Sequence, residues 1–156
     1  MVESARAGLR PLRLPLEALL GLPRAGAWTL VAAWCALITL LSSQPGSAEP
    51  SAWIWSVLSN GAHAPEFGLL AAWLSLLAPR REGWPDLRAR VRLAVVATVA
   101  GLGLSDELHQ GLTPGRDLSI FDLLTDVVGA ALMLELIAYL ARREAKLSGF
   151  AARFAL

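Results

Sequence analysis

Ionisable side chains interrupt otherwise apolar stretches of this 156-residue sequence. The group comprises both histidines and several acidic or amide residues: His63, Glu66, Asp106, Glu107, His109, Gln110, Asp122 and Asp126. Histidine needs the least pKa adjustment for acid–base work near neutral pH, and a neighbouring carboxylate can orient its ring. These residue types favour acid–base hydrolysis or group transfer. Redox and nucleotide chemistry are not indicated, because the sequence has no P-loop, dinucleotide fingerprint or haem ligand pair.

The spacing of these residues suits helices. His63 and Glu66 are three apart and Asp122 and Asp126 are four apart, so each pair shares a helix face. A metal site is chemically possible with such side chains. Because no local spacing is a recognised ligand motif, we predict no metal and assign no cofactor.

Composition indicates a membrane protein. Hydrophobic residues make up 55% of the chain and charged residues only 17%, too few to cover a small soluble domain. The net charge is +1 and the basic residues form separate clusters, so nucleic acid is not expected as a partner. The single cysteine, Cys35, lies in an apolar run and can form no internal disulfide.

Four stretches have about the length and polarity of membrane spans, for which roughly 20 apolar residues suffice. They cover residues 25–41, 62–78, 93–110 and 120–140. We therefore predict an all-α, polytopic membrane protein with a four-helix transmembrane bundle at residues 25–140. A basic N-terminal segment, 1–24, and a basic amphipathic tail, 141–156, flank this domain. Trp53 and Trp55 suggest a short segment at the outer interface, where indoles are favoured.

Arginine placement predicts the orientation. The N-terminal segment, the connection after the second span and the C-terminal tail are all rich in arginine. By contrast, residues 42–61 have no basic residue and residues 111–119 have only Arg116. The positive-inside rule then places both termini in the cytoplasm. The two tails read as helices on the anionic lipids of the inner leaflet, with disordered, solvated tails as the alternative.

The polar residues are expected to share one depth. At ~1.5 Å per residue, Asp106 lies about 21 Å from Arg92, and Asp126 about 24 Å from Arg142. Ionisable groups inside the ~30 Å hydrocarbon layer cost several kcal/mol unless they meet each other or water. We expect them to converge on a polar cavity that faces outside. Glu135 lies near the inner surface, where Arg142 or Arg143 is the expected partner.

Five motifs together resemble the VanZ-like family of membrane proteins. They are SSQPG at residues 42–46, HAPEF at 63–67, SDELHQ at 105–110, PGR at 114–116 and DLLTDVVGA at 122–130. The resemblance covers about residues 42–130. Family members often have a charged pair before the histidine, whereas this chain has Ser59 and Asn60, so no phosphate contact is carried over to that position.

The resemblance implies a function in the bacterial cell envelope, since the family is named for resistance to glycopeptides, especially teicoplanin. We expect a multi-pass protein of the inner membrane that binds a lipid-linked or peptidoglycan-related molecule, and whether it is an enzyme stays open. The alternatives are a non-catalytic scaffold whose buried charges are structural, and a proton-coupled carrier. An oligomer is compatible with the sequence.

The candidate residues fall into two groups. The catalytic candidates are His63, Glu66, Glu107, His109 and Asp126. The candidates for substrate contact are Ser43, Gln44, Gln110, Arg116 and Asp122. Arg116 suits a phosphate, because its guanidinium binds in a planar fork; a structural ion pair with Asp106, Glu107 or Asp122 is the alternative.

The topology can be tested by cysteine labelling. Cysteines that replace Ser47 and Thr113 should react with a membrane-impermeant maleimide on intact cells, while one that replaces Gly83 should not. Cys35 should stay unreactive throughout. Labelling at position 83 from outside would contradict the orientation.

Overall fold

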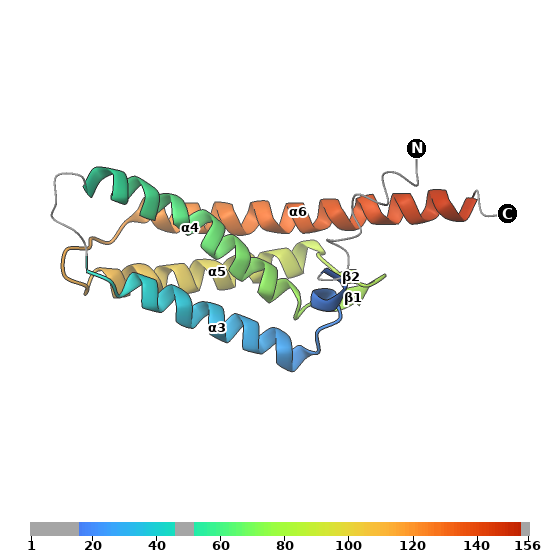
Figure 1. The fold of residues 1–156 in the computed structure, drawn as a ribbon, viewed down its shortest axis with the longest axis horizontal. Helices are drawn as coiled ribbons and strands as arrows, with labels where there is room; N and C mark the ends of the chain where they lie inside the picture. Colours follow the sequence, from blue (N-terminus) through green and yellow to red (C-terminus); the bar gives the residue numbers. More distant parts are fainter. Residues whose placement is uncertain (1–15, 46–51, 154–156) are drawn as a thin grey trace.

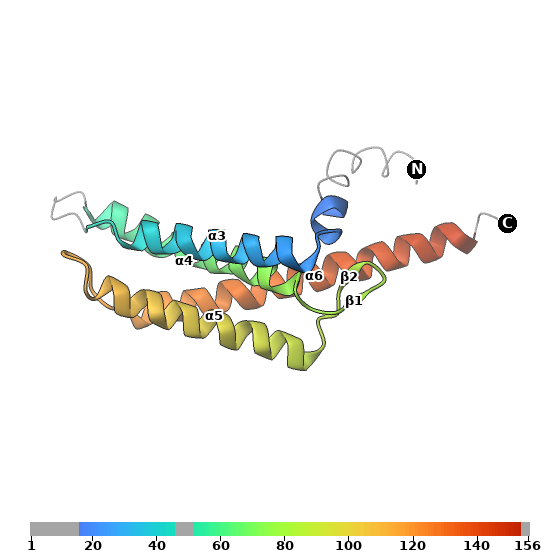
Figure 2. The same cartoon turned by 90° about the horizontal axis from the view of Figure 1, so that it is seen from below.

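The protein is mostly helical in the computed structural model, which describes residues 16–45 and 52–153. Its long helices are α3 (Arg24–Ser42), α4 (Ala52–Ser75), α5 (Ala89–Gln110) and α6 (Ile120–Arg153). A hairpin of β1 (Arg80–Arg81) and β2 (Trp84–Pro85) joins α4 to α5. The four helices run alongside one another (Figure 1), with α3 and α4 on one side and α5 on the other (Figure 2). The hairpin and the end of α6 lie at one end of the molecule, and the α5–α6 connection lies at the other.

Each of the four predicted helices begins or ends within three residues of an expected bound, but α4 begins early. It begins at Ala52, ten residues before the predicted start at 62. The separate interfacial segment expected at Trp53 and Trp55 is therefore wrong, because both residues belong to the first turns of α4. The predicted helix began after the polar residues 59–61, because they lower the hydropathy of the sequence there. Each of them destabilises a helix by only about 1 kcal/mol or less, so the helix continues through them.

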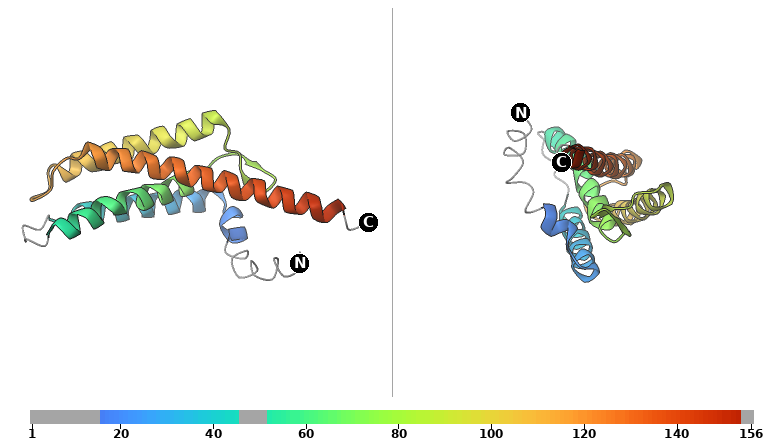
Figure 3. Two further views of the ribbon diagram at one scale, coloured as in Figure 1. Left: turned by 90° about the horizontal axis from the view of Figure 1, so that it is seen from above. Right: turned by 90° about the vertical axis from the view of Figure 1, so that its right-hand side faces the viewer.

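Helix α6 is also longer than predicted. It has 34 residues and continues to Arg153 instead of ending near 140. At ~1.5 Å per residue it is about 51 Å long, well beyond the ~30 Å of a hydrocarbon layer. The expected amphipathic tail at 141–156 is thus mainly a straight extension of α6 (Figure 3) and not a helix that turns aside. The N-terminal segment lies outside the described residues up to residue 15, and residues 16–20 are helical.

The β1–β2 hairpin was not expected from the sequence. Glu82 and Gly83 have φ angles of 52° and 84°, which is typical of tight two-residue hairpin turns. The indole nitrogen of Trp84 donates to Glu144 on the extension of α6 at 3.2 Å. The hairpin is thereby fixed against α6.

The expected partner of Glu135 is wrong. Its carboxylate pairs with Arg92 of α5 and not with Arg142 or Arg143. Arg142 is seven residues further along α6, whereas direct side-chain pairs on one helix are three or four residues apart. The pair therefore joins α5 to α6 near the end that carries the hairpin.

Small residues allow α4 and α6 to approach closely. A Cβ atom on Gly129 of α6 would overlap the backbone of Ala64 in α4, and one on Gly68 would lie 3.1 Å from the Gly129 carbonyl oxygen. Small residues at helix contacts permit such a close approach. Beside this contact lies an apolar core whose best-buried members include Phe67, Leu70, Val99 and Leu134.

Among the described residues, two helices are long and apolar enough to cross a membrane. They are α3 and the part of α6 from Ile120 to Lys146, and only 22% and 28% of their most apolar windows are buried. A helix in the core of a soluble protein would bury far more. Large apolar side chains are also exposed on α5, where Leu93 is 70% exposed.

The α4–α6 contact should be sensitive to one methyl group. Gly129→Ala should destabilise the protein by about 1–3 kcal/mol, because the helices must separate to make room. The melting temperature in detergent measures this effect.

Gly101→Ala is the matched control, since a Cβ atom there meets nothing within 4 Å. It should be neutral or stabilise by about 0.5–1 kcal/mol, as alanine favours a helix over glycine. Equal melting temperatures for the two variants would refute the close contact.

Candidate functional site

A histidine and an aspartate from different helices form the centre of the polar site. His63 Nδ1 of α4 lies 3.0 Å from Asp126 Oδ1 of α6. The two residues are 5% and 0% exposed, respectively. The His63 ring also stacks on Phe67, one helix turn along α4, with the ring centroids 6.1 Å apart. Both contacts fix the orientation of the imidazole.

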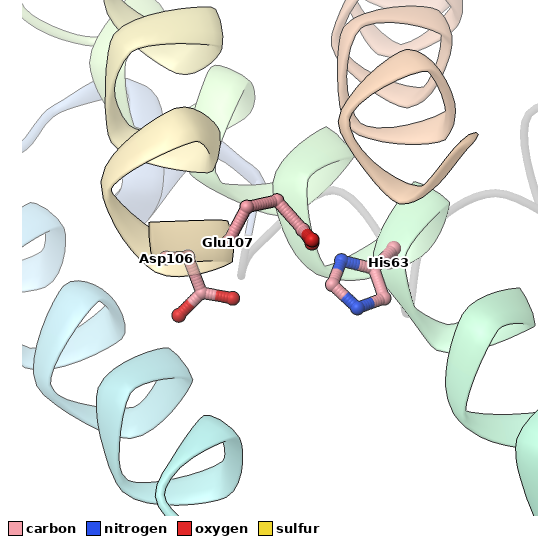
Figure 4. A group of neighbouring side chains, drawn as sticks. All are labelled: His63, Asp106 and Glu107. Atoms are coloured by element: carbon pink, nitrogen blue, oxygen red, sulfur yellow. The ribbon is translucent and has the colours of Figure 1, made fainter. Parts of the chain in front are cut away.

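Two consecutive acids of α5 complete the site. His63, Asp106 and Glu107 each offer one nitrogen or oxygen atom that could bind a metal ion. These three atoms lie within 4.8 Å of one another, and all three residues are buried. Figure 4 shows the Glu107 carboxylate pointing toward the imidazole of His63. The predicted convergence of His63, Glu107 and Asp126 is present. We refer to these three residues and Asp106 as the acid–histidine cluster.

Asp106 is held by neighbours on both oxygens. Ser42 Oγ of α3 donates to Oδ1 at 2.5 Å, and Gln110 Nε2 donates to Oδ2 at 2.8 Å. Arg116 in turn donates to Gln110 Oε1 at 3.3 Å and to the Gln44 carbonyl oxygen at 3.2 Å. Ser42 thus brings α3 into the site, and Arg116 reaches Asp106 only through Gln110.

The turn after α5 positions Arg116. Gly115 has a φ angle of 74°, in the left-handed region that glycine adopts without strain. The Arg116 N–H closes the turn by donating to the Thr113 carbonyl oxygen at 3.1 Å. The Pro-Gly-Arg motif therefore folds the chain back toward the end of α5.

Glu107 joins α5 to the start of α6. Its Oε2 accepts a hydrogen bond from the backbone N–H of Ser119 at 2.7 Å. The Ser119 hydroxyl accepts from the Asp122 N–H at 3.2 Å, as an N-terminal helix cap does. The carboxylate therefore sits against the positive end of the α6 dipole.

Two carboxylate oxygens in the cluster have no hydrogen-bond partner among the described residues. They are Glu107 Oε1 and Asp126 Oδ2, and both atoms are fully buried. Gly103 of α5 lies beside Asp126, since a Cβ atom there would come within 2.5 Å of Oδ2. A buried acceptor without a hydrogen-bond partner lowers the stability of the fold. These two oxygens can therefore still accept a proton, a hydrogen bond or a cation.

A pocket of about 190 Å³ adjoins the cluster between α3, α4 and α5. Asp106 and Phe67 belong to its wall and also to the surroundings of His63. The rest of the wall combines apolar and polar side chains: Cys35, Ile38, Thr39, Leu70, Leu102, Ser105 and His109. The polar cavity expected from the sequence is thus a mixed pocket, whose wall includes Asp106 but not His63, Glu107 or Asp126.

The remaining predicted residues lie around the cluster. His109 contacts Ser43, with Nε2 and Oγ 2.9 Å apart, at the pocket side of α5 and away from His63. Glu66 is half-buried and makes its recorded hydrogen bond through its backbone oxygen, to Trp34. Asp122 is buried at the start of α6. The direct ion pair considered for Arg116 is wrong, because its guanidinium donates to Gln44 and Gln110 instead.

Some site residues were missing from the predicted set. Asp106 was expected in the polar layer but not as a catalytic or binding residue. Ser42 and Phe67 belong to motifs that carry the family resemblance, but they were not among the candidate site residues, and neither were Gly103 and Ser119. Asp106 and Gln110 are four apart on α5, and this spacing was a usable signal for Asp106. The contacts of Ser42 and Ser119 join separate helices, so no local pattern indicates them.

The fold and the exposed apolar surfaces define a helical membrane protein with a buried acid–histidine cluster. Residues 27–142 match the VanZ/LLP1 family, and the chain belongs to this family. The match includes every residue of the acid–histidine cluster and of the pocket. Neither the curated proteins nor the solved structures give a match to this chain.

The crowding of carboxylates predicts a stability pattern. In detergent with a chelator present, Asp126→Asn and Glu107→Gln should melt at or above the parent, because each removes a buried negative charge and keeps the shape. His63→Ala should lower stability by ~3–5 kcal/mol, since it leaves Asp126 buried and unpaired.

Asp86→Asn serves as control, because this carboxylate pairs with Arg88 at 2.7 Å outside the cluster. It should shift stability by no more than about 1 kcal/mol, as surface pairs do. A large loss of stability in Glu107→Gln would contradict the crowding argument.

Proposed function

We propose that this VanZ-family protein binds a lipid-linked phosphate or diphosphate of the cell envelope, drawn from the outer leaflet. His63, oriented by Asp126, then acts as the acid–base group in hydrolysis or group transfer. The observation that carries the proposal is the pocket, whose apolar wall ends at Asp106 and His109, directly beside the cluster. An amphiphilic molecule with an apolar chain and a polar head fits such a gradient.

The proposal places all four long helices across a bacterial inner membrane, with both termini in the cytoplasm. The exposed leucines of α5 support this, as does the length of α4, at 24 residues. Arginine-rich segments gather at the end that carries the hairpin, whereas the cluster lies toward the α5–α6 connection. By the positive-inside rule the site then faces outside.

Each site residue has a distinct role in this proposal. His63 takes or gives a proton, and Asp126 orients the ring and stabilises its charged form. The Glu107 carboxylate points toward the imidazole (Figure 4) and can exchange a proton with a water or hydroxyl. Arg116, with His109 at the pocket, contacts the polar head, since a guanidinium donates to phosphate oxygens in a planar fork.

A second candidate function is a non-catalytic binding protein or scaffold. It is favoured by the bonds that Asp106 and Glu107 make to Ser42 of α3 and to Ser119 at the start of α6. These contacts join helices and would be needed for folding alone. In that case the cluster only holds the helices together, and the pocket still binds the lipid.

We further propose that anionic lipids of the inner leaflet bind at the opposite end. A pocket of about 580 Å³ there is lined by four arginines and three acids: Arg81, Arg88, Arg92, Arg142, Glu82, Asp86 and Glu144. Basic pockets on the cytoplasmic side of membrane helices suit anionic head groups.

The experiment uses farnesyl phosphate and farnesyl diphosphate with the purified protein, and native mass spectrometry measures binding. Leu102→Trp fills the pocket and should reduce binding at least tenfold. Leu93→Trp is the matched control on the same helix, because Leu93 is 70% exposed and lies outside the pocket. Equal binding by both variants would refute the ligand assignment.

Release of inorganic phosphate then separates the two candidates. The parent should release phosphate from the diphosphate, while Asp126→Asn should bind normally and lose at least 90% of turnover. Glycopeptide tolerance of a sensitive host gives a cellular readout of the same variants. Binding without turnover in the parent would favour the scaffold and exclude the enzyme.

A further inference from the structure

The acid–histidine cluster holds more negative than positive charge. Asp106, Glu107 and Asp126 are 7%, 1% and 0% exposed, and His63 is the basic group in contact with them. Arg116 does not offset this charge directly, because its recorded bonds go to Gln44 and Gln110. Buried charges are stable only when they are paired or coordinate a cation.

The geometry of the donors suits a metal ion. One atom each from His63, Asp106 and Glu107 lie within 4.8 Å of one another. Ligands held at ~2.1 Å from a common ion lie about 3–4 Å apart, so small side-chain rotations close the site. The fully buried Glu107 Oε1 has no hydrogen-bond partner among the described residues, and its carboxylate points toward His63 (Figure 4).

Each of these donors is already held in place by a second residue. Asp126 bonds to His63, Ser42 and Gln110 bond to Asp106, and the Ser119 N–H bonds to Glu107 Oε2. Metal sites orient their ligands in this way, and a carboxylate behind a ligating histidine is one of the usual forms. Because Nδ1 of His63 bonds to Asp126, Nε2 is the ring nitrogen that would bind the ion. The supporting bonds leave lone pairs on the carboxylates, because each oxygen can accept more than once.

We propose that His63, Asp106 and Glu107 bind a divalent transition-metal ion, of the class of Zn²⁺ or Mn²⁺. The imidazole favours these ions over Mg²⁺ and Ca²⁺, which prefer oxygen ligands alone. Three protein ligands leave a position open to water or to an anionic group from the adjoining pocket. The sequence carries no ligand motif, because the donors come from two helices and two are consecutive residues.

Metal binding is testable without any lipid. The full-length protein is purified in detergent, treated with EDTA and desalted. Mn²⁺ binding is followed by loss of the free Mn²⁺ signal in electron paramagnetic resonance, and Zn²⁺ content is measured after dialysis. The parent should bind about one ion per chain, and the ion should raise its melting temperature.

Glu107→Gln keeps an acceptor for Ser119 and should weaken binding at least tenfold while melting near the parent in EDTA. Asp126→Asn, behind His63, should weaken binding by about 10–100-fold. Glu135→Gln is the matched control, because Glu135 pairs with Arg92 away from the cluster. No binding by the parent, tighter binding of Mg²⁺ than of Mn²⁺, or equal binding by Glu107→Gln and Glu135→Gln would each overturn the proposal.

This result is independent of the lipid assignment. Failure to bind farnesyl diphosphate with intact Mn²⁺ binding would refute the proposed ligand alone. Lipid binding by a parent protein that takes up neither Mn²⁺ nor Zn²⁺ would refute the metal site alone.

Discussion

Carboxylates buried among apolar helices must obtain all their partners from the protein itself, since little water reaches them. Asp106 meets this condition with bonds to Ser42 and Gln110, and Glu107 meets it at one of its two oxygens with a bond to Ser119. The bonds to Ser42 and Ser119 join α5 to other parts of the chain. The same interactions that satisfy the acids also set the relative positions of α3, α5 and α6. The hydrogen bonds that the buried carboxylates need are therefore also bonds that hold the tertiary structure together.

The closest helix contact and the chemical site share the same turns. His63 precedes Ala64, whose backbone meets Gly129, and Asp126 lies one helix turn before Gly129. A larger residue at 129 would push α4 from α6 and stretch the bond between His63 and Asp126. The small residues thus give the buried pair its short distance, and the pair adds a polar link to a contact that otherwise depends on packing.

The sequence predicted the helices and the layer of polar residues because apolar length and charge placement are local properties. The contact between His63 and Asp126 was predicted from the similar depth of the two residues in the membrane, which helix tilt changes little. Other features depend on contacts that local patterns do not contain. The pairing of Glu135 with Arg92, the hairpin at Glu82 and Gly83, and the early start of α4 are of this kind. The family resemblance led us to expect an envelope function, whereas the pocket is formed by contacts between three helices.

Recognition at this site depends on where the positive charge lies. Arg116 donates to two neutral oxygens, of Gln44 and Gln110, so its guanidinium can turn to a phosphate without leaving a carboxylate unpaired. Inside, the cluster repels an anion unless a proton or a cation is present first. A divalent ion at His63, Asp106 and Glu107 would offset two of the three carboxylate charges of the cluster and so weaken its repulsion of an anion at the end of the pocket, next to Asp106. An anionic head group could then bind at the open position of the ion, with the guanidinium of Arg116 as a second positive group.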